Sequence, residues 1–314
     1  MASDFKIFNG RANPELTKEI CAVLNIPLGN MEVNTFPDGE IFIQINETVR
    51  GIDTFVIQPT APRVNESLLE LLIIIDTLKR ASARRVTAII PYYGYARQDR
   101  KDQPRVPLTA KLVANLITIA GADRVLTVDL HAGQIQGFFD IPLDNLFATQ
   151  ILVNYFKGLK LQNLVVVSPD IGSVKRARAF ARNMDTLLAI VDKRRPKAGQ
   201  AEVMNIIGEV EDKNVIIFDD MVDTAGTMTE AVVALKEAGA LDIYAGCTHG
   251  VLSGEALPRI MGSPMKELVI TNTIAVGDKM EKCPKLKVLS IANLVAQAIS
   301  NIYHNTSVSA LFPQ

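Results

Sequence analysis

The chain has 314 residues, of which 48% are hydrophobic and 21% are charged, and its formal net charge is −1. This length predicts about two domains of ~150 residues each, and the near-zero charge excludes a general attraction to nucleic acid. No stretch approaches the ~18 consecutive apolar residues of a membrane span, and the N-terminus lacks the apolar segment of a signal peptide. Three widely separated cysteines, Cys21, Cys247 and Cys283, favour neither a disulfide framework nor a clustered metal site. We therefore expect a cytoplasmic globular protein without nucleic-acid or membrane partners.

Short β-branched segments alternate with helical patterns along the whole chain. The predicted strands cover residues 54–58, 86–90, 125–130, 164–168, 187–192, 215–220 and 243–248. They lack alternation of polar and apolar residues, which indicates strands buried on both faces. Apolar stripes with helical spacing occupy 228–238 and 291–302. This order predicts an α/β fold with parallel sheets covered by helices on both faces, and ligands bound beyond the carboxyl ends of the strands.

The first distinctive motif is FPDGE at residues 36–40, between the segments MEVNT and IFIQI. An Asp-Gly pair between two such segments is typical of a β-hairpin turn. Taken alone, the motif predicts this hairpin and no ligand.

Two further motifs follow predicted strands in the first half of the chain. YGYARQDRKDQPR at 93–105 interleaves four cationic residues with aspartates. Guanidinium groups at a strand end suit a polyphosphate, although a solvated charged loop is the alternative. VDLHAGQIQGFFD at 128–140 places His131 just beyond the next strand, where a single histidine is more often structural.

Two motifs in the second half also lie at strand ends. Asp170 and Gly172, in SPDIGS, form a strand-to-helix turn, and the loop DKRRPKAG at 192–199 follows the next strand. Pro196 and Gly199 disfavour regular structure in that loop. The alternative to a ligand-binding role is a solvated basic connector.

The most informative segment is DDMVDTAGT at 219–227, which follows the apolar run NVIIF. Its second half begins a helix, whose free N–H groups, together with Gly226, allow a phosphate to approach closely. Asp219 and Asp220 at the strand end suit vicinal hydroxyls or a metal. A sugar phosphate satisfies both halves, whereas a solvated acidic turn with Thr224 as an ordinary helix N-cap is the alternative.

DDMVDTAGT resembles the phosphoribosyl pyrophosphate (PRPP) binding loop of type I phosphoribosyltransferases. With FPDGE, YARQDRK, DLHAGQIQGFFD, SPDIG and DKRRP in the same order and spacing, nearly the whole chain is similar to class I ribose-phosphate diphosphokinases. The resemblance implies two phosphoribosyltransferase-like domains, 1–145 and 146–314, each a mainly parallel sheet flanked by helices, with the last residues packing back on the first domain. It also implies transfer of the β,γ-diphosphoryl group of ATP to the anomeric hydroxyl of ribose 5-phosphate, giving PRPP and AMP.

The same resemblance implies roles for individual residues. The ATP-binding residues would be Phe36, Asp38, Gly39 and Glu40, from a hairpin of a neighbouring subunit, with Arg97 and Gln98. The ribose 5-phosphate residues would be Arg195, Asp219, Asp220, Asp223, Thr224, Ala225, Gly226 and Thr227. The pyrophosphate loop would be Asp170, Gly172 and Ser173, with His131 and Asp170 at Mg²⁺. The catalytic residues would be Lys193 and Arg195, on a lid formed by the 192–199 loop.

Partners and assembly are implied in the same way. The family forms homohexamers and binds the effectors phosphate and ADP between subunits, through segments that Arg50, 134–140 and 307–309 resemble. Mg²⁺ is a hard ion, so we expect mainly phosphate and water ligands around it. The chain has no GxxxxGK[ST] motif, which excludes a Walker A loop for ATP.

Some positions depart from the usual family pattern. Ser173 stands where a second glycine is usual, Gly250 replaces a proline, Pro104 interrupts the cationic loop, and 58–66 is about a residue shorter. Two other functions stay open: a phosphoribosyltransferase that uses a base, and a non-catalytic regulatory paralogue. Only the diphosphokinase would release AMP from ATP and ribose 5-phosphate.

Overall fold

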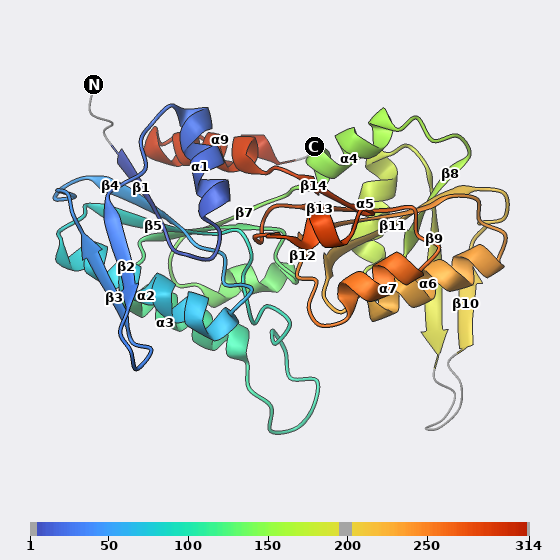
Figure 1. The fold of residues 1–314 in the computed structure, drawn as a ribbon, viewed down its shortest axis with the longest axis horizontal. Helices are drawn as coiled ribbons and strands as arrows, with labels where there is room; N and C mark the ends of the chain where they lie inside the picture. Colours follow the sequence, from blue (N-terminus) through green and yellow to red (C-terminus); the bar gives the residue numbers. More distant parts are fainter. Residues whose placement is uncertain (1–4, 195–202, 313–314) are drawn as a thin grey trace. The chain divides into compact units, whose positions relative to one another are not determined.

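The computed structural model describes residues 5–194 and 203–312. By their internal contacts, the residues form two compact units (Figure 1). The first unit comprises Met1–Phe147, Thr273–Ala275 and Ser290–Gln314, and the second comprises Ala148–Asn272 and Val276–Leu289. The C-terminal segment therefore belongs to the same unit as the N-terminal half.

The first unit is built on a five-stranded, wholly parallel sheet in the order β1-β4-β5-β6-β7. Its strands are β1 (Phe5–Asn9), β4 (Asp53–Ile57), β5 (Arg85–Ile90), β6 (Arg124–Val128) and β7 (Leu143–Leu146). Its helices are α1 (Pro14–Leu24), α2 (Val64–Arg80), α3 (Thr109–Ala120) and α9 (Ala292–Tyr303), with short 3₁₀ turns η1 (Gly133–Phe138) and η2 (Ser309–Leu311). Figure 1 shows α1 and α9 together on one side of the sheet and α2 and α3 on the other.

A separate hairpin packs on this unit. Strands β2 (Met31–Thr35) and β3 (Ile41–Ile45) are antiparallel, with Thr35 opposite Ile41. Its Ile43 is buried in the same core as α2, so one face of the hairpin lies on that helix. The hairpin predicted from the Asp-Gly turn is confirmed.

The second unit contains a seven-stranded sheet in the order β10-β9-β8-β11-β12-β13-β14, in which all strands but β10 run parallel. Its strands are β8 (Leu164–Ser168), β9 (Leu187–Arg194), β10 (Val203–Ile207), β11 (Asn214–Val222), β12 (Ile243–Gly250), β13 (Glu267–Thr271) and β14 (Leu286–Leu289). Its helices are α4 (Thr149–Gly158), α5 (Val174–Asn183), α6 (Gly226–Glu237), α7 (Ala256–Gly262) and α8 (Lys279–Lys282). Val166 packs with α4 and α5 while Val165 packs with α6 and α7, because successive strand residues reach opposite faces.

The predicted α/β class is confirmed, and all seven strands predicted from apolar runs are present. The strands that the sequence pattern missed are β1, β7, β10, β13 and β14, and of these only β13 is not at a sheet edge. The loop expected from residue 192 begins later, since β9 continues through Lys193 and Arg194, which pair with Met204 and Val203 of β10. Among the described residues, no helix has the length and apolar character needed to cross a bilayer.

Candidate functional site

Two neighbouring carboxylates lie near the end of the central strand β11. Asp220 is 2% exposed, and the side chain of Asp219 is 17% exposed. The ladder between β8 and β11 ends at Val167 and Ile217, so both carboxylates lie beyond it, at the carboxyl edge of the sheet. The sequence predicts that these carboxylates face ribose hydroxyls, and in the structure both also contact partners within the protein.

Those partners come from α5 and the turn that precedes it. Arg176 donates from Nη1 to Asp220 Oδ1 at 2.9 Å and to Asp219 Oδ1 at 3.3 Å. The Ser173 hydroxyl donates to Asp219 Oδ1 at 2.7 Å. Burial and the adjacent charge of Asp220 raise the pKa of Asp219 to about 7, against the opposing effect of the Ser173 hydrogen bond. Asp219 therefore binds a proton more readily than a hydrated, isolated aspartate does.

The predicted pyrophosphate loop is a compact turn between β8 and α5. The Ser173 N–H donates to Asp170 Oδ1 at 2.8 Å, and the Ser168 hydroxyl donates to the Asp170 carbonyl oxygen at 2.7 Å. A Cβ at Gly172 would lie 3.3 Å from Asp170 Oδ1, which leaves little room for a side chain. Ser173 is 6% exposed and connects this turn to β11 through its bond to Asp219.

The predicted sugar-phosphate loop leads from β11 into α6. Ala225 has a φ of 61°, in the left-handed region, and the first return bond of the helix is Thr229 N–H to the Ala225 carbonyl oxygen at 2.9 Å. N–H groups earlier in a helix have no acceptor within it, so they can bind an anion. Gly226 itself is not left-handed, and a Cβ there would come no closer than 3.5 Å to the protein.

Two residues outside the motif brace this loop. The Ser253 hydroxyl donates to the carboxylate of Asp223, and Arg259 Nη1 donates to the Thr224 carbonyl oxygen at 2.9 Å. Thr227 is exposed in the first turn of α6. The loop therefore has a defined backbone path, with room for a Cβ at Gly226 next to Arg259.

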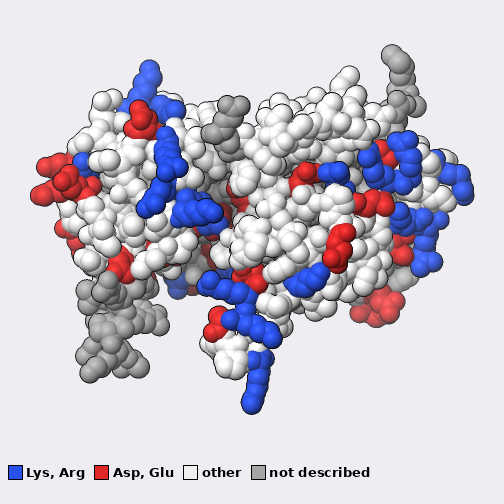
Figure 2. Space-filling view, turned by 180° about the vertical axis from the view of Figure 1, so that it is seen from behind, with Lys and Arg blue, Asp and Glu red and all other residues white. Residues whose placement is uncertain are grey.

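In the first unit, the predicted ATP residues lie on the loop between β5 and α3. Arg97 and Gln98 are exposed, and the Gln98 side chain accepts a hydrogen bond from the Thr109 hydroxyl. Gln134 Nε2 donates to Asp99 Oδ2 at 2.6 Å, which joins this loop to the one that follows β6 and carries His131. Figure 2 shows Lys and Arg side chains gathered on a protrusion, which Figure 1 identifies as the β5–α3 loop.

The tip of the β2–β3 hairpin forms an ordered turn. Phe36 N–H donates to the Glu40 carbonyl oxygen at 2.8 Å, Glu40 N–H donates to Asp38 Oδ1 at 3.1 Å, and Gly39 has a φ of 97° that favours glycine. The Phe36 ring is 50% exposed, with its centroid 5.8 Å from that of Phe42. An exposed aromatic ring on a fixed turn suits stacking on a flat heterocycle.

The remaining predicted residues concern the metal and the lid. His131 belongs to the first unit and Asp170 to the second. Within the described ranges, no group of three or more His, Cys, Asp or Glu side chains could hold a metal. A single partly exposed Asp170 carboxylate fits an ion such as Mg²⁺, which takes most of its ligands from phosphate and water. For Lys193 the structure describes only the backbone, which belongs to β9. Arg195 lies outside the described residues.

Sequence reasoning missed Arg176, Ser253 and Arg259. Arg176 is one of several basic residues on α5, and nothing in its local pattern indicates that it contacts β11. Its position three residues after Ser173 was the available signal, because residues i and i+3 share a helix face. Ser253 and Arg259 contact the sugar-phosphate loop from 30 and 35 residues away, without a local signal.

We expect Asp219→Asn to change the pH dependence of stability. Because the folded pKa is raised from 3.8 to about 7, the wild-type protein loses stability between these values as pH rises. The asparagine lacks this loss, so its advantage in unfolding free energy over the wild type should grow between pH 4 and pH 7 and then stay constant. Thermal unfolding across pH measures it, with Asp212→Asn at an exposed site as control. Parallel profiles for wild type and Asp219→Asn would contradict the raised pKa.

Comparison with known proteins identifies the family. Residues 5–121 match the family model for the N-terminal domain of ribose phosphate pyrophosphokinase, and residues 190–313 match the phosphoribosyl synthetase-associated domain. The chain is 58% identical to the ribose-phosphate pyrophosphokinase of Clostridium perfringens, over 99% of this chain and 98% of the relative, and 56% identical to that of Bacillus caldolyticus, over 98% and 97%. The crystal structure of phosphoribosylpyrophosphate synthetase from Mycobacterium smegmatis is similar with a TM-score of 0.91 at 43% identity, covering 96% of this chain and 99% of that one. The chain belongs to the ribose-phosphate pyrophosphokinase family.

Proposed function

We propose that this chain transfers the β,γ-diphosphoryl group of ATP to the anomeric hydroxyl of ribose 5-phosphate and releases PRPP and AMP. The observation that carries the proposal is the pairing of a sugar-phosphate turn at the end of β11 with a compact turn at the end of the adjacent β8. Asp219 and Ser173 connect these two turns directly. Family membership supports the same reaction.

Ribose 5-phosphate binds to the second unit in this proposal. The first turn of α6, with Thr224, Gly226 and Thr227, holds the 5-phosphate. Asp219 is the more exposed member of the acid pair and accepts hydrogen bonds from the ribose hydroxyls, while buried Asp220 holds Arg176 in place. Asp223 and Ala225 complete the loop.

ATP binds to residues of the first unit. Arg97 and Gln98 contact the triphosphate, and the hairpin residues Phe36, Asp38, Gly39 and Glu40 reach the adenine from a neighbouring subunit. The active form is therefore a homo-oligomer, and we propose that it is a hexamer. Phosphate and ADP act on it as effectors, and they bind at Arg50, 134–140 and 307–309. The Phe36 ring supports this arrangement, because it is 50% exposed beside Phe42 and its open side can stack on a base.

The chemistry needs positioning and charge neutralisation more than covalent assistance. The anomeric oxygen attacks the β-phosphorus, the bond from that phosphorus to the α,β-bridging oxygen breaks, AMP leaves with this oxygen, and the hydroxyl proton passes to solvent. Asp170 and His131 would hold Mg²⁺, which supplies positive charge to the triphosphate when bound. Asp170, Gly172 and Ser173 orient the diphosphoryl group, and Lys193 and Arg195 neutralise charge that develops on it.

The cellular location belongs to the same proposal. Cys21, Cys247 and Cys283 are all buried free thiols. Free thiols persist in a reducing compartment, which supports a cytoplasmic enzyme.

A product assay tests the reaction. With ATP, Mg²⁺ and ribose 5-phosphate, and without a nucleobase, we expect AMP and PRPP in equal amounts, measured by chromatography. Omission of ribose 5-phosphate is the control and should stop AMP release. Absence of AMP would favour the regulatory paralogue, and formation of a nucleotide only from PRPP and a base would favour the base-using phosphoribosyltransferase.

Gly226→Ala tests the sugar-phosphate loop. The protein leaves room for the methyl group, with the nearest atom 3.5 Å away, so folding should be unaffected. A phosphate at the first turn of α6 would meet that methyl group, and we expect ribose 5-phosphate affinity to fall at least about 10-fold while ATP affinity is unchanged. Calorimetry measures both, with Gly262→Ala as control, because a Cβ at Gly262 would meet no atom within 4 Å. Unchanged sugar-phosphate affinity would remove the loop from the site.

Alanine substitutions test the proposed lid. Donors aimed at charge that develops in the transition state are worth roughly 3–4 kcal/mol each, or about 10²–10³ in rate. Lys193→Ala and Arg195→Ala should each lower kcat by at least this factor with modest changes in KM, whereas the control Arg194→Ala should do much less. Steady-state kinetics that show raised KM at normal kcat would instead make the segment a docking surface.

A further inference from the structure

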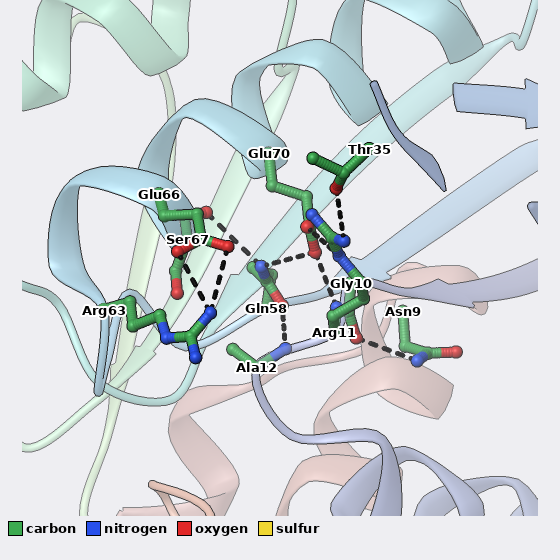
Figure 3. A network of polar contacts seen from close by, with 10 residues as sticks. All are labelled: Asn9, Gly10, Arg11, Ala12, Thr35, Gln58, Arg63, Glu66, Ser67 and Glu70. Atoms are coloured by element: carbon green, nitrogen blue, oxygen red, sulfur yellow. Dashed lines mark hydrogen bonds and ion pairs between the residues drawn. The ribbon is translucent and has the colours of Figure 1, made fainter. Parts of the chain in front are cut away.

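A buried glutamate lies at the carboxyl edge of the first unit's sheet. Glu70, on α2, is 2% exposed. Its two carboxylate oxygens accept hydrogen bonds from the backbone N–H and the Nε of Arg11, each at 2.6 Å (Figure 3). A buried carboxylate is strongly destabilising unless it is paired, so this two-point contact fixes the Arg11 side chain.

A second buried residue holds the segment that carries Arg11. Gln58 follows β4 and is 0% exposed, with Nε2 donating to Glu70 Oε1 at 3.0 Å and Oε1 accepting from Ala12 N–H at 3.1 Å. A Cβ at Gly10 would lie 2.3 Å from Gln58 Oε1, so only glycine allows this close approach. These contacts therefore fix the path of the segment that follows β1, as Figure 3 shows.

The free end of Arg11 reaches the hairpin. Its Nη1 donates to the Thr35 hydroxyl at 2.8 Å. Thr35 is the last residue of β2, and Phe36 follows it directly. The hairpin is a two-stranded sheet of its own, without ladder pairing to the main sheet, so side-chain contacts determine where its tip lies.

We infer that Arg11, clamped by Glu70, is a positioning residue for ATP binding: it fixes the end of β2 from which Phe36, Asp38 and Glu40 project. This rests on the proposed role of the hairpin in the nucleotide site. Arginine suits the task because its planar fork can bond Glu70 through Nε and Thr35 through Nη1 at once, which a lysine ammonium cannot reproduce. The clamp should therefore affect ATP and leave ribose 5-phosphate binding alone.

Thr35→Val is the decisive variant, since it keeps the branched side chain on an exposed strand and removes only the acceptor oxygen. We expect KM for ATP to rise about 3- to 10-fold, with kcat and KM for ribose 5-phosphate unchanged. Thr35→Ser should restore the wild-type KM for ATP. Arg63→Ala, which breaks an exposed pair with Glu66 at the same end of α2, is the matched control and should leave both KM values unchanged.

Two further variants distinguish failure of the role inferred for Arg11 from failure of the role proposed for the hairpin. Arg11→Lys retains a cation for Glu70 and should raise KM for ATP as Thr35→Val does. Phe36→Ala should raise it as well, because the ring is the hairpin's proposed contact with the adenine. An effect of Phe36→Ala with none from Thr35→Val or Arg11→Lys would overturn the role of Arg11 alone. No effect of Phe36→Ala on ATP would overturn the hairpin's role and, with it, this inference.

Discussion

The arrangement of the second unit depends on two adjacent carboxylates that share one guanidinium group. Asp219 and Asp220 lie near the end of β11, and both are largely buried, so neither can be fully hydrated. Arg176 offsets one negative charge and Ser173 stabilises part of the other. Removal of one partner from a buried ion pair typically costs about 3–5 kcal/mol, which makes the contact between α5 and β11 hard to change. The turn proposed to hold pyrophosphate leads into α5, and the turn proposed to hold the sugar phosphate follows β11, so the same contact fixes both.

The first unit also contains a buried carboxylate paired with an arginine, but the net charge of the pair differs. Glu70 is a single buried carboxylate paired with the single cation of Arg11, and the pair is neutral. Asp219 and Asp220 retain an excess negative charge beside Arg176, and burial together with the adjacent charge of Asp220 raises the pKa of Asp219 to about 7. The neutral pair suits a purely positional task, whereas the negative site suits hydrogen bonds to hydroxyl groups, and that difference agrees with the ligands proposed for the two units.

The reaction proposed for this family member places little demand on covalent chemistry and much on placement. In the first unit the Arg11–Glu70 pair supports a hairpin that would touch substrate, whereas in the second unit Asp219 is itself proposed to contact the ribose hydroxyls. The Ser173 hydroxyl adds a side-chain link between the two turns of the second unit.

The sequence alone determined the features that depend on local pattern. Uninterrupted apolar runs predicted the central strands, the Asp-Gly pair predicted the hairpin, and helical spacing predicted α6 and α9. The same criterion missed β1, β7, β10 and β14, because an edge strand is not enclosed on both sides and need not be uniformly apolar. It also missed β13, an interior strand to which this reason does not apply. Only the tertiary structure decided that Arg176 meets Asp220 from 44 residues away and that Arg11 meets Glu70 from 59 residues away. Such pairs form where folded strands and helices bring oppositely charged side chains together away from water. Local propensity and periodicity do not predict which distant residue will be the partner.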